Sequence, residues 1–169
     1  AADGGPVVTI GTFSFLAFIV LQRLGELVLA KRNTAALLAR GAHEAGAGHY
    51  PVMVALHTAW VLGLVAFGFG EPINAIWLAV YVVLQFLRVW ILATLGPRWT
   101  TRIIVIDEPL VAKGPFRFLP HPNYTLVVFE IFVAPMVLGL LWLAVLFSVL
   151  NALMLYHRIR VEDHALRRS

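Results

Sequence analysis

The sequence predicts an all-α integral membrane protein that crosses the bilayer about five times. Of its 169 residues, 60% are hydrophobic and only 13% are charged, whereas roughly 25% of residues are charged in a soluble globular domain. The mean hydropathy is +0.85, and a chain of this length could not hide so much apolar surface from water, so the bilayer is the expected solvent. The length allows a single compact helical domain, residues 1–169, and no second one.

Long apolar runs determine the number of spans. The run from Tyr124 to Tyr156 has Glu130 as its only formal charge, and as one helix it would be roughly 50 Å long, well over a bilayer core of about 30 Å. Pro135 and Gly139 lie near its middle, so two shorter helices fit better than one. The five expected spans are residues 7–30, 52–69, 73–95, 124–137 and 140–158.

Lysines and arginines fall on one side of this five-span arrangement, and the connections on the other side hold none. The positive-inside rule then places the N-terminus outside and the C-terminus in the cytoplasm. The pI near 10 is explained by this orientation rather than by binding to nucleic acid. The basic residues are Lys31, Arg32 and Arg40 in the first loop, Arg98, Arg102, Lys113 and Arg117 in the second, and Arg158, Arg160, Arg167 and Arg168 in the tail.

The second of these loops also contains β-type sequence. Residues 103–106 and 110–111 are apolar and flank Asp107-Glu108-Pro109. This pattern predicts a short hairpin on the cytoplasmic face.

A Pro-rich segment, residues 113–124, leads into the fourth span. Pro120 and Pro122 disfavour helical backbone at the residue before each, so His121 is expected in an extended approach. Asn123 is a good N-cap for the fourth span, and the free N–H groups of that helix end offer a docking place for an anionic group. A Pro-rich stop before a membrane helix explains the same residues equally well.

The tail holds a second polar cluster. Arg158 and Glu162 are four residues apart and therefore share one helix face, with His157 beside them. Both an ordinary salt bridge in a membrane anchor and a functional pair fit this spacing.

Several polar residues lie at membrane depth, where such residues usually face the bundle interior. Glu130 is expected to face inward and pair with a group such as Arg88. Arg23, Glu26 and Arg88 lie near the predicted cytoplasmic ends, where their side chains could extend to the membrane surface. Interhelical hydrogen bonds would explain His57 and Asn151. No His pair has metal-ligand spacing around a carboxylate, so no metal site is expected. The set is Arg23, Glu26, His57, Gln85, Arg88, Glu130 and Asn151.

Three motifs carry a family resemblance: Gly-Pro-Phe-Arg at 114–117, His-Pro-Asn-Tyr at 121–124 and Arg-Ile-Arg-Val-Glu-Asp at 158–163. In order and spacing they resemble those of the isoprenylcysteine carboxyl methyltransferase superfamily. Residues 95–100 resemble the segment that precedes these motifs in the family. Residues 23–27, 32–33 and 46–51 look like its small bacterial branch, whose enzymes are associated with O-methylation of long-chain alkyl pyrones or phenols.

The resemblance implies a membrane methyltransferase that uses S-adenosylmethionine and releases S-adenosylhomocysteine. It implies a bacterial inner membrane location with the active site facing the cytoplasm. The expected partners are membrane lipid and a lipophilic acceptor, either a small molecule or a prenyl- or alkyl-chain substrate, with no nucleic acid.

The same resemblance implies roles for residues. Arg158 and Glu162 are expected to be catalytic, with Arg158 facing the acceptor oxygen. Pro120 stands where the family usually has Arg, so the contact to the cofactor's carboxylate is either missing or supplied by Arg117. The expected cofactor-binding residues are Lys113, Gly114, Arg117, His121, Pro122, Asn123, Tyr124 and Glu162. Polar residues at or near membrane depth are candidates for acceptor binding, namely Arg88, Glu130, Asn151 and His157.

The acceptor itself stays open. A carboxylate needs no base, whereas a phenolic or enolic hydroxyl must lose a proton, for which Glu162, His157 and His121 are candidates. Two other interpretations also remain. One is a nicotinamide-dependent membrane reductase of unsaturated lipids, and the other is a non-enzymatic membrane subunit or small transporter.

Overall fold

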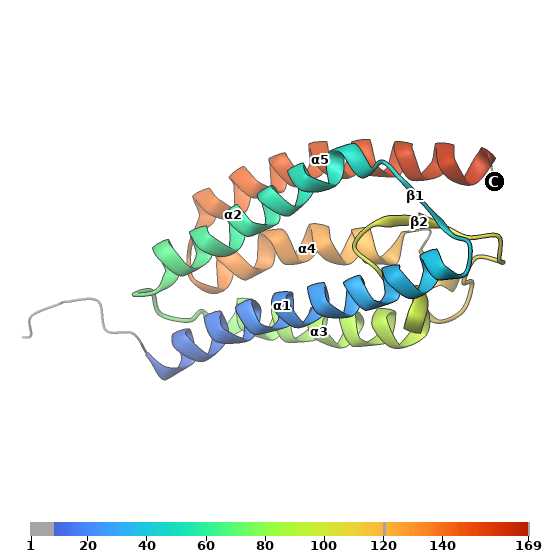
Figure 1. Cartoon of the computed structure of the whole chain (residues 1–169). Helices are drawn as coiled ribbons and strands as arrows, with labels where there is room; N and C mark the ends of the chain where they lie inside the picture. Colours follow the sequence, from blue (N-terminus) through green and yellow to red (C-terminus); the bar gives the residue numbers. More distant parts are fainter. Residues whose placement is uncertain (1–8, 120, 169) are drawn as a thin grey trace, which may run out of the picture.

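Five α-helices form the part of the chain that the computed structural model describes, residues 9–119 and 121–168. The helices run roughly along one axis and alternate in direction (Figure 1). Their bounds are α1 Ile10–Ala39, α2 Tyr50–Gly68, α3 Ala75–Leu95, α4 Pro122–Val137 and α5 Leu141–Arg168.

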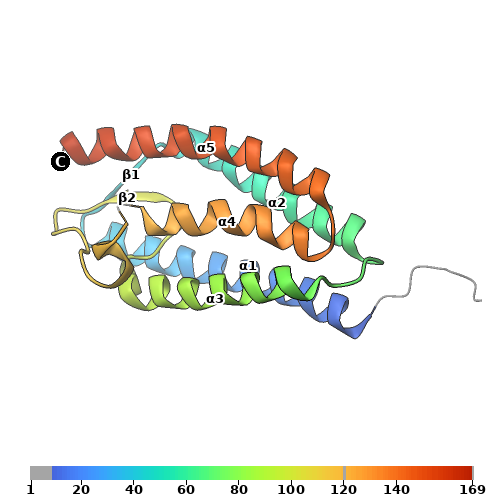
Figure 2. The ribbon, with the colours of Figure 1, turned by 180° about the vertical axis from the view of Figure 1, so that it is seen from behind.

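One end of the bundle gathers the start of α1, the α2–α3 connection and the α4–α5 turn (Figures 1 and 2). Hydrogen bonds join these three places. Thr12 Oγ1 donates to the carbonyl of Glu71 at 2.7 Å, and the N–H of Asn74 donates to the carbonyl of Val137 at 2.8 Å. This end therefore holds the connections without basic residues, which the sequence predicted to lie on one side of the membrane.

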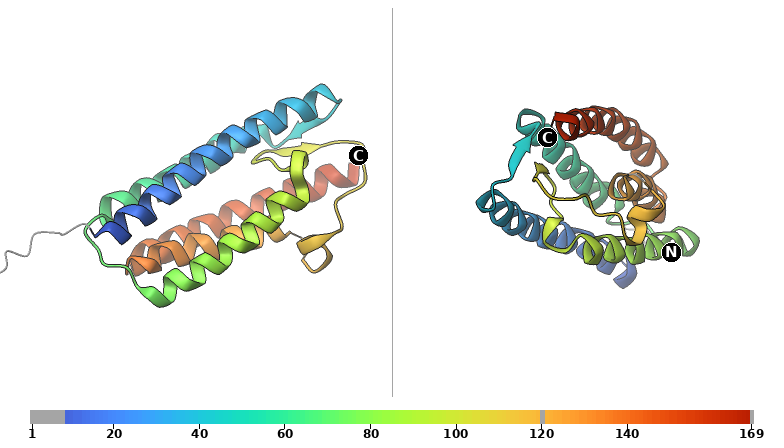
Figure 3. Two further views of the ribbon diagram at one scale, coloured as in Figure 1. Left: turned by 90° about the horizontal axis from the view of Figure 1, so that it is seen from below. Right: turned by 90° about the vertical axis from the view of Figure 1, so that its right-hand side faces the viewer.

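The opposite end gathers the two long connections and the end of α5. A short antiparallel ladder crosses it, formed by β1 His43–Ala45 and β2 Ile103–Val105 with His43 opposite Val105 (Figure 3). Three short 3₁₀ turns lie in the same connections, at Ala47–His49, Gly96–Arg98 and Gly114–Arg117. All three basic clusters of the sequence belong to this end.

Helix α4 packs against both α3 and α5 and supplies much of the core. The helix has 16 residues, which correspond to about 24 Å. Pro135 lies in its last turn, and its carbonyl accepts from the N–H groups of Leu138 and Leu140 at 3.1 and 3.0 Å. Gly139 has φ +70°, a conformation that favours glycine. The predicted break of the long apolar run into two helices is confirmed.

The outer faces of the helices are apolar. Phe86 is 73% exposed, Leu153 67% and Leu62 63%, although side chains of this kind would be buried in a protein surrounded by water. Within the described residues, four helices are long and apolar enough to cross a membrane, and α4 is the shorter fifth. The chain is therefore a multi-pass, all-α membrane protein, while its orientation in the bilayer stays a prediction.

Three local predictions need correction. The first and last helices continue to Ala39 and Arg168 rather than ending near 30 and 158, because an exposed helix can extend beyond the apolar run. Strand 103–105 forms, but it pairs with β1 and not with residues 110–111. The start of the first span at residues 7 and 8, and Pro120, lie outside the described residues.

Asn123 is not the N-cap of α4. The helix begins at Pro122, with His121 in the capping position and Thr125 Oγ1 donating to the His121 carbonyl at 3.0 Å. Proline is favoured at the first helical position because its ring fixes φ and no N–H is lost there. Asn123 therefore lies inside the first turn.

Candidate active site

A cavity of about 600 Å³ lies among the five helices and reaches the end of the bundle that carries the β ladder. This volume falls within the roughly 300–1,000 Å³ of typical small-molecule sites. Its walls are mostly apolar, with polar groups from α1, α2, α3, α4 and α5. The segment 99–106, which includes β2, closes one side of it.

The start of α4 and the last turns of α5 meet at this cavity. The hydroxyl of Tyr124, in the first turn of α4, donates to Glu162 Oε2 on α5. Beside this hydrogen bond, His121 Nε2 at the start of α4 lies 3.9 Å from Asp163 Oδ1 of α5. Proline 122 starts α4 in the register that directs Tyr124 inward, and the continuation of α5 to residue 168 brings Glu162 opposite. His121, Pro122, Asn123, Tyr124 and Glu162 all line the cavity.

Arg158 lines the same cavity and is 5% exposed. It does not pair with Glu162, so the intrahelical salt bridge is not formed. Instead, Arg158 Nη2 donates to the carbonyl of Thr101 at 2.9 Å, and its guanidinium lies 6.0 Å from the Tyr124 ring centroid. Nη1 of the same side chain is buried without a hydrogen-bond partner among the described residues. Arg158 is thus part of an enclosed polar site and does not lie on the surface of the bundle.

The sequence analysis did not assign the segment 99–106 to the site, although its residues form hydrogen bonds with α1, α2 and α5. Asn33 Nδ2 of α1 donates to the Trp99 carbonyl at 2.8 Å, and Tyr50 of α2 shares a hydrogen bond of 2.8 Å with Thr101 Oγ1. Trp99 is 4% exposed, and its Nε1 has no partner within residues 9–119 and 121–168. The sequence signals here were the apolar, β-type run at 103–106, which predicted a strand, and the family likeness of residues 95–100; neither placed the segment at the cavity.

Five predicted site residues lie outside the cavity lining, and one of them, Glu130, belongs to the buried network described below. Gly114 has φ +61°, and a Cβ there would meet Thr94 Oγ1 of α3 at 2.8 Å, so its place is set by close packing. The other three are Lys113, Arg117 and His157. The Arg117 guanidinium lies 5.7 Å from the centroid of the neighbouring Phe118 ring, and the His157 ring packs 4.9 Å from that of His49.

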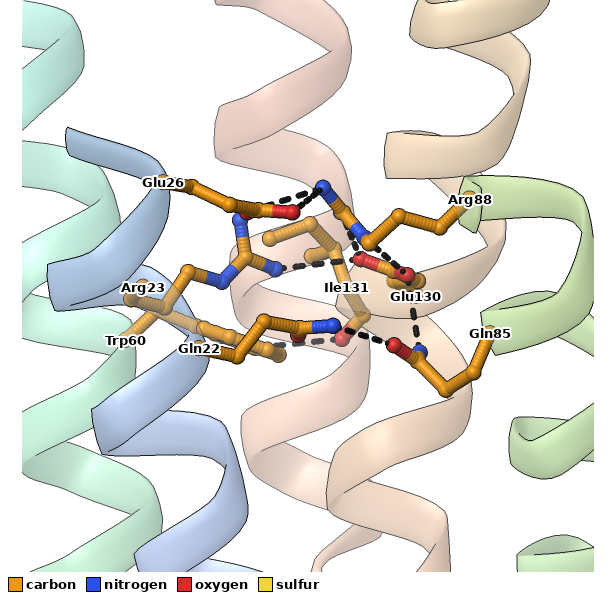
Figure 4. Close-up of polar contacts among 8 residues, drawn as sticks. All are labelled: Gln22, Arg23, Glu26, Trp60, Gln85, Arg88, Glu130 and Ile131. Atoms are coloured by element: carbon orange, nitrogen blue, oxygen red, sulfur yellow. Dashed lines mark hydrogen bonds and ion pairs between the residues drawn. The ribbon is translucent and has the colours of Figure 1, made fainter. Parts of the chain in front are cut away.

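Glu130 is fully buried and joins three helices in one polar network (Figure 4). Its carboxylate accepts hydrogen bonds from Arg88 of α3, from Gln85 Nε2 at 3.0 Å and from Arg23 Nη2 of α1 at 3.1 Å. Arg88 Nη1 also donates to both oxygens of Glu26 at 2.8 and 3.0 Å. The prediction that Glu130 faces inward and pairs with Arg88 is confirmed.

The same network corrects the snorkelling interpretation. Arg88 is 3% exposed, so it does not extend to the membrane surface. Two guanidinium groups and two carboxylates balance one another, which keeps the net charge at this depth near zero. Arg23, Glu26 and Arg88 line the inner part of the cavity, while Glu130 lies behind them. Arg88 and Asn151 are thus the two acceptor candidates that reach the cavity.

Two comparisons with known proteins match most of this chain. The sequence model of the isoprenylcysteine carboxyl methyltransferase (ICMT) family matches residues 77–168, which contain most of α3, all of α4 and α5, and the segment that closes the cavity. The chain is also 35% identical to the uncharacterized protein YpbQ of Bacillus subtilis (strain 168) over 158 residues, which cover 90% of this chain and 94% of that protein. No solved structure matches the chain.

The family match contains the residues that meet at the cavity mouth, including Tyr124, Arg158 and Glu162. It favours a membrane methyltransferase over the reductase and over the non-enzymatic membrane subunit. The chain therefore belongs to the isoprenylcysteine carboxyl methyltransferase family.

Proposed function

We propose that this membrane methyltransferase transfers a methyl group from S-adenosylmethionine to an oxygen of a lipophilic acceptor, at the cytoplasmic end of the bundle. The observation that carries the proposal is the hydrogen bond between Tyr124 and Glu162 at the mouth of a cavity that continues between the helices. It joins two of the family's motif positions, which lie at opposite ends of the last helical hairpin.

The residues at the mouth fit the charge pattern of S-adenosylmethionine. When bound, it supplies an activated methyl group on a sulfonium. A sulfonium is attracted by the Glu162 carboxylate and by the faces of aromatic rings such as that of Tyr124. The cofactor's own carboxylate suits the positive N-terminus of α4 at Pro122 and any free donor nearby. Arg158 Nη1 and Trp99 Nε1 are buried donors without partners in the described chain, so they fit a ligand oxygen.

The inner cavity fits an apolar chain. Leu24 and Leu27 of α1 and Leu62 of α2 line it, yet they are 56%, 43% and 63% exposed on the bundle surface. Side chains that face both the cavity and the surrounding lipid indicate an opening between α1 and α2. We infer that the acceptor's hydrocarbon chain enters there from the bilayer, while the polar cofactor arrives from the cytoplasm.

Alignment and exclusion of water would supply most of the rate enhancement. Methyl transfer is an in-line displacement, and holding both reactants in place removes much of its entropic barrier. Arg158, fixed by its hydrogen bond to Thr101, would position the acceptor oxygen. Glu162 would hold the methyl donor. We place the protein in the inner membrane of a bacterium, with the basic end in the cytoplasm.

Binding of S-adenosylhomocysteine to the detergent-purified protein tests this assignment. We expect Tyr124→Phe to weaken the affinity about tenfold or more, because Glu162 loses the hydrogen bond that orients it. Tyr156→Phe is the matched control, since Tyr156 is 65% exposed on the outer face of α5 and does not line the cavity.

Calorimetry on the wild type and both variants gives the three affinities. Equal affinity in Tyr124→Phe and wild type would remove Tyr124 from the site. Absence of binding in the wild type would contradict the proposed function itself.

A further inference from the structure

A chain of hydrogen bonds connects the start of α2 to Arg158 through Thr101. Arg158 Nη2 donates to the Thr101 carbonyl at 2.9 Å, and the Thr101 hydroxyl shares a hydrogen bond of 2.8 Å with the hydroxyl of Tyr50. Strand β2 begins at Ile103 and pairs with β1 from that residue on, so Thr101 lies outside the ladder. Backbone in a connection is more mobile than backbone in a helix or strand. The bond to Tyr50 therefore helps to fix where the Thr101 carbonyl lies.

Tyr50 is itself anchored. It is the first residue of α2, a helix of 19 residues. The Arg102 guanidinium lies 3.9 Å from the centroid of its ring, which is a cation–π contact. Arg102 Nη1 in turn donates to Glu44 Oε1 of β1 at 2.8 Å. The Tyr50 hydroxyl thus reaches the irregular segment from a side chain whose backbone and ring are both held in place.

Tyr50 is not part of the cavity wall. Thr101 and Arg158 line the cavity, whereas Tyr50 does not, so it acts on a bound reactant only through other residues. It also lies before residue 77, where the family match begins. The match therefore assigns Tyr50 no role, and its role has to be inferred from its contacts.

We propose that Tyr50 is a positioning residue for methyl transfer, which holds the Thr101 carbonyl where it orients the Arg158 guanidinium. This inference rests on the proposed function, in which Arg158 positions the acceptor oxygen. A guanidinium is planar and rigid, so a hydrogen bond that fixes Nη2 also fixes the direction of Nη1. In Arg158, Nη1 is the buried nitrogen that lacks a partner among the described residues. Its direction decides where an acceptor oxygen can be bound.

Tyr50→Phe removes the hydroxyl and keeps the ring beside Arg102. With a long-chain phenol, pyrone or prenyl-cysteine that the wild type methylates, we expect kcat to fall about tenfold, the effect of one lost hydrogen bond. The affinity for S-adenosylhomocysteine should stay at the wild-type value, because Arg158 positions the acceptor and not the methyl donor. Thr101→Val breaks the same hydrogen bond from its other side. It should cause the same loss, and the two changes together should cost no more than either alone.

A second background separates positioning from a general loosening of the bundle. Arg158→Lys removes the guanidinium that Tyr50 orients. Adding Tyr50→Phe to it should therefore lower kcat by less than about twofold further. A purely structural role of Tyr50 would instead give the same loss with and without Arg158→Lys.

Tyr156→Phe is the matched control. The Tyr156 ring and hydroxyl also contact an arginine, Arg160, but neither residue lines the cavity, so this variant should keep the wild-type kcat. Wild-type kcat in both Tyr50→Phe and Thr101→Val would overturn the role of Tyr50 and leave the proposed function intact. An equal loss by Tyr50→Phe in the two backgrounds would do the same. A wild-type protein that neither transfers methyl groups nor binds S-adenosylhomocysteine would end the proposed function, and the role of Tyr50 with it.

Discussion

Glu130 holds a negative charge in the centre of the bundle, and its two arginine partners come from different helices. Removing one member of a buried ion pair leaves its partner uncompensated, at a cost of about 3–5 kcal/mol. We therefore expect Glu130→Gln to destabilise the protein by about that amount, because Arg23 and Arg88 would then share only Glu26.

Thermal unfolding in one detergent measures the effect. Glu108→Gln is the matched control, since its pair with Arg40 is largely exposed and such pairs contribute about 0–1 kcal/mol. Equal melting temperatures for the two variants would show that the network is not what holds α1, α3 and α4 together.

For single residues, the sequence predicted which side chains face the bundle interior better than it predicted which side chains they pair with. The cost of a carboxylate in lipid is enough to predict that Glu130 faces inward and meets a cation such as Arg88. That Arg23 and Glu26 join it depends on the depth and rotation of α1 against α3. A position near a helix end fits snorkelling and burial equally well, so local sequence could not decide between them.

For helices and strands, local sequence predicted where an element ends but not which distant segment it pairs with. Pro135 and Gly139 mark the turn between α4 and α5, because proline and glycine act on the backbone at their own positions. Strand 103–105 was visible as a β-branched run, but its partner lies in the distant α1–α2 connection. Nothing in the local pattern shows that the two connections meet.

Some residues of the family motifs line the cavity and others do not. Tyr124 and Glu162 meet at the cavity mouth as the two ends of the last hairpin require, because an antiparallel helix pair returns the chain to one surface. Gly114 belongs to a motif of the same family, but the structure packs it against Thr94 of α3. A motif residue can therefore hold the backbone of the site without lining the cavity.

For the whole molecule, the arrangement of helices places both long connections and the C-terminal end of α5 at one end (Figure 1). The basic clusters belong to that end, so the positive-inside rule predicts a cytoplasmic C-terminus and an N-terminus on the other side. Accessibility labelling of a tag at each terminus in intact cells and in opened membranes measures this. Labelling of both tags from the same side would contradict the five-span arrangement.

The central claim is that the Tyr124–Glu162 end of the cavity performs methyl transfer to a lipophilic oxygen. The most direct measurement follows labelled methyl groups from S-adenosylmethionine into an organic-soluble product, with the purified protein and a long-chain phenol, pyrone or prenyl-cysteine acceptor. We expect transfer by the wild type and a loss on the order of a hundredfold in Arg158→Lys and Glu162→Gln, since displacing either group by about 1 Å misaligns the reactants. Arg160→Lys, at a residue outside the cavity lining, should transfer at the wild-type rate. No transfer to any acceptor by the wild type, or wild-type rates in Arg158→Lys and Glu162→Gln, would contradict the claim.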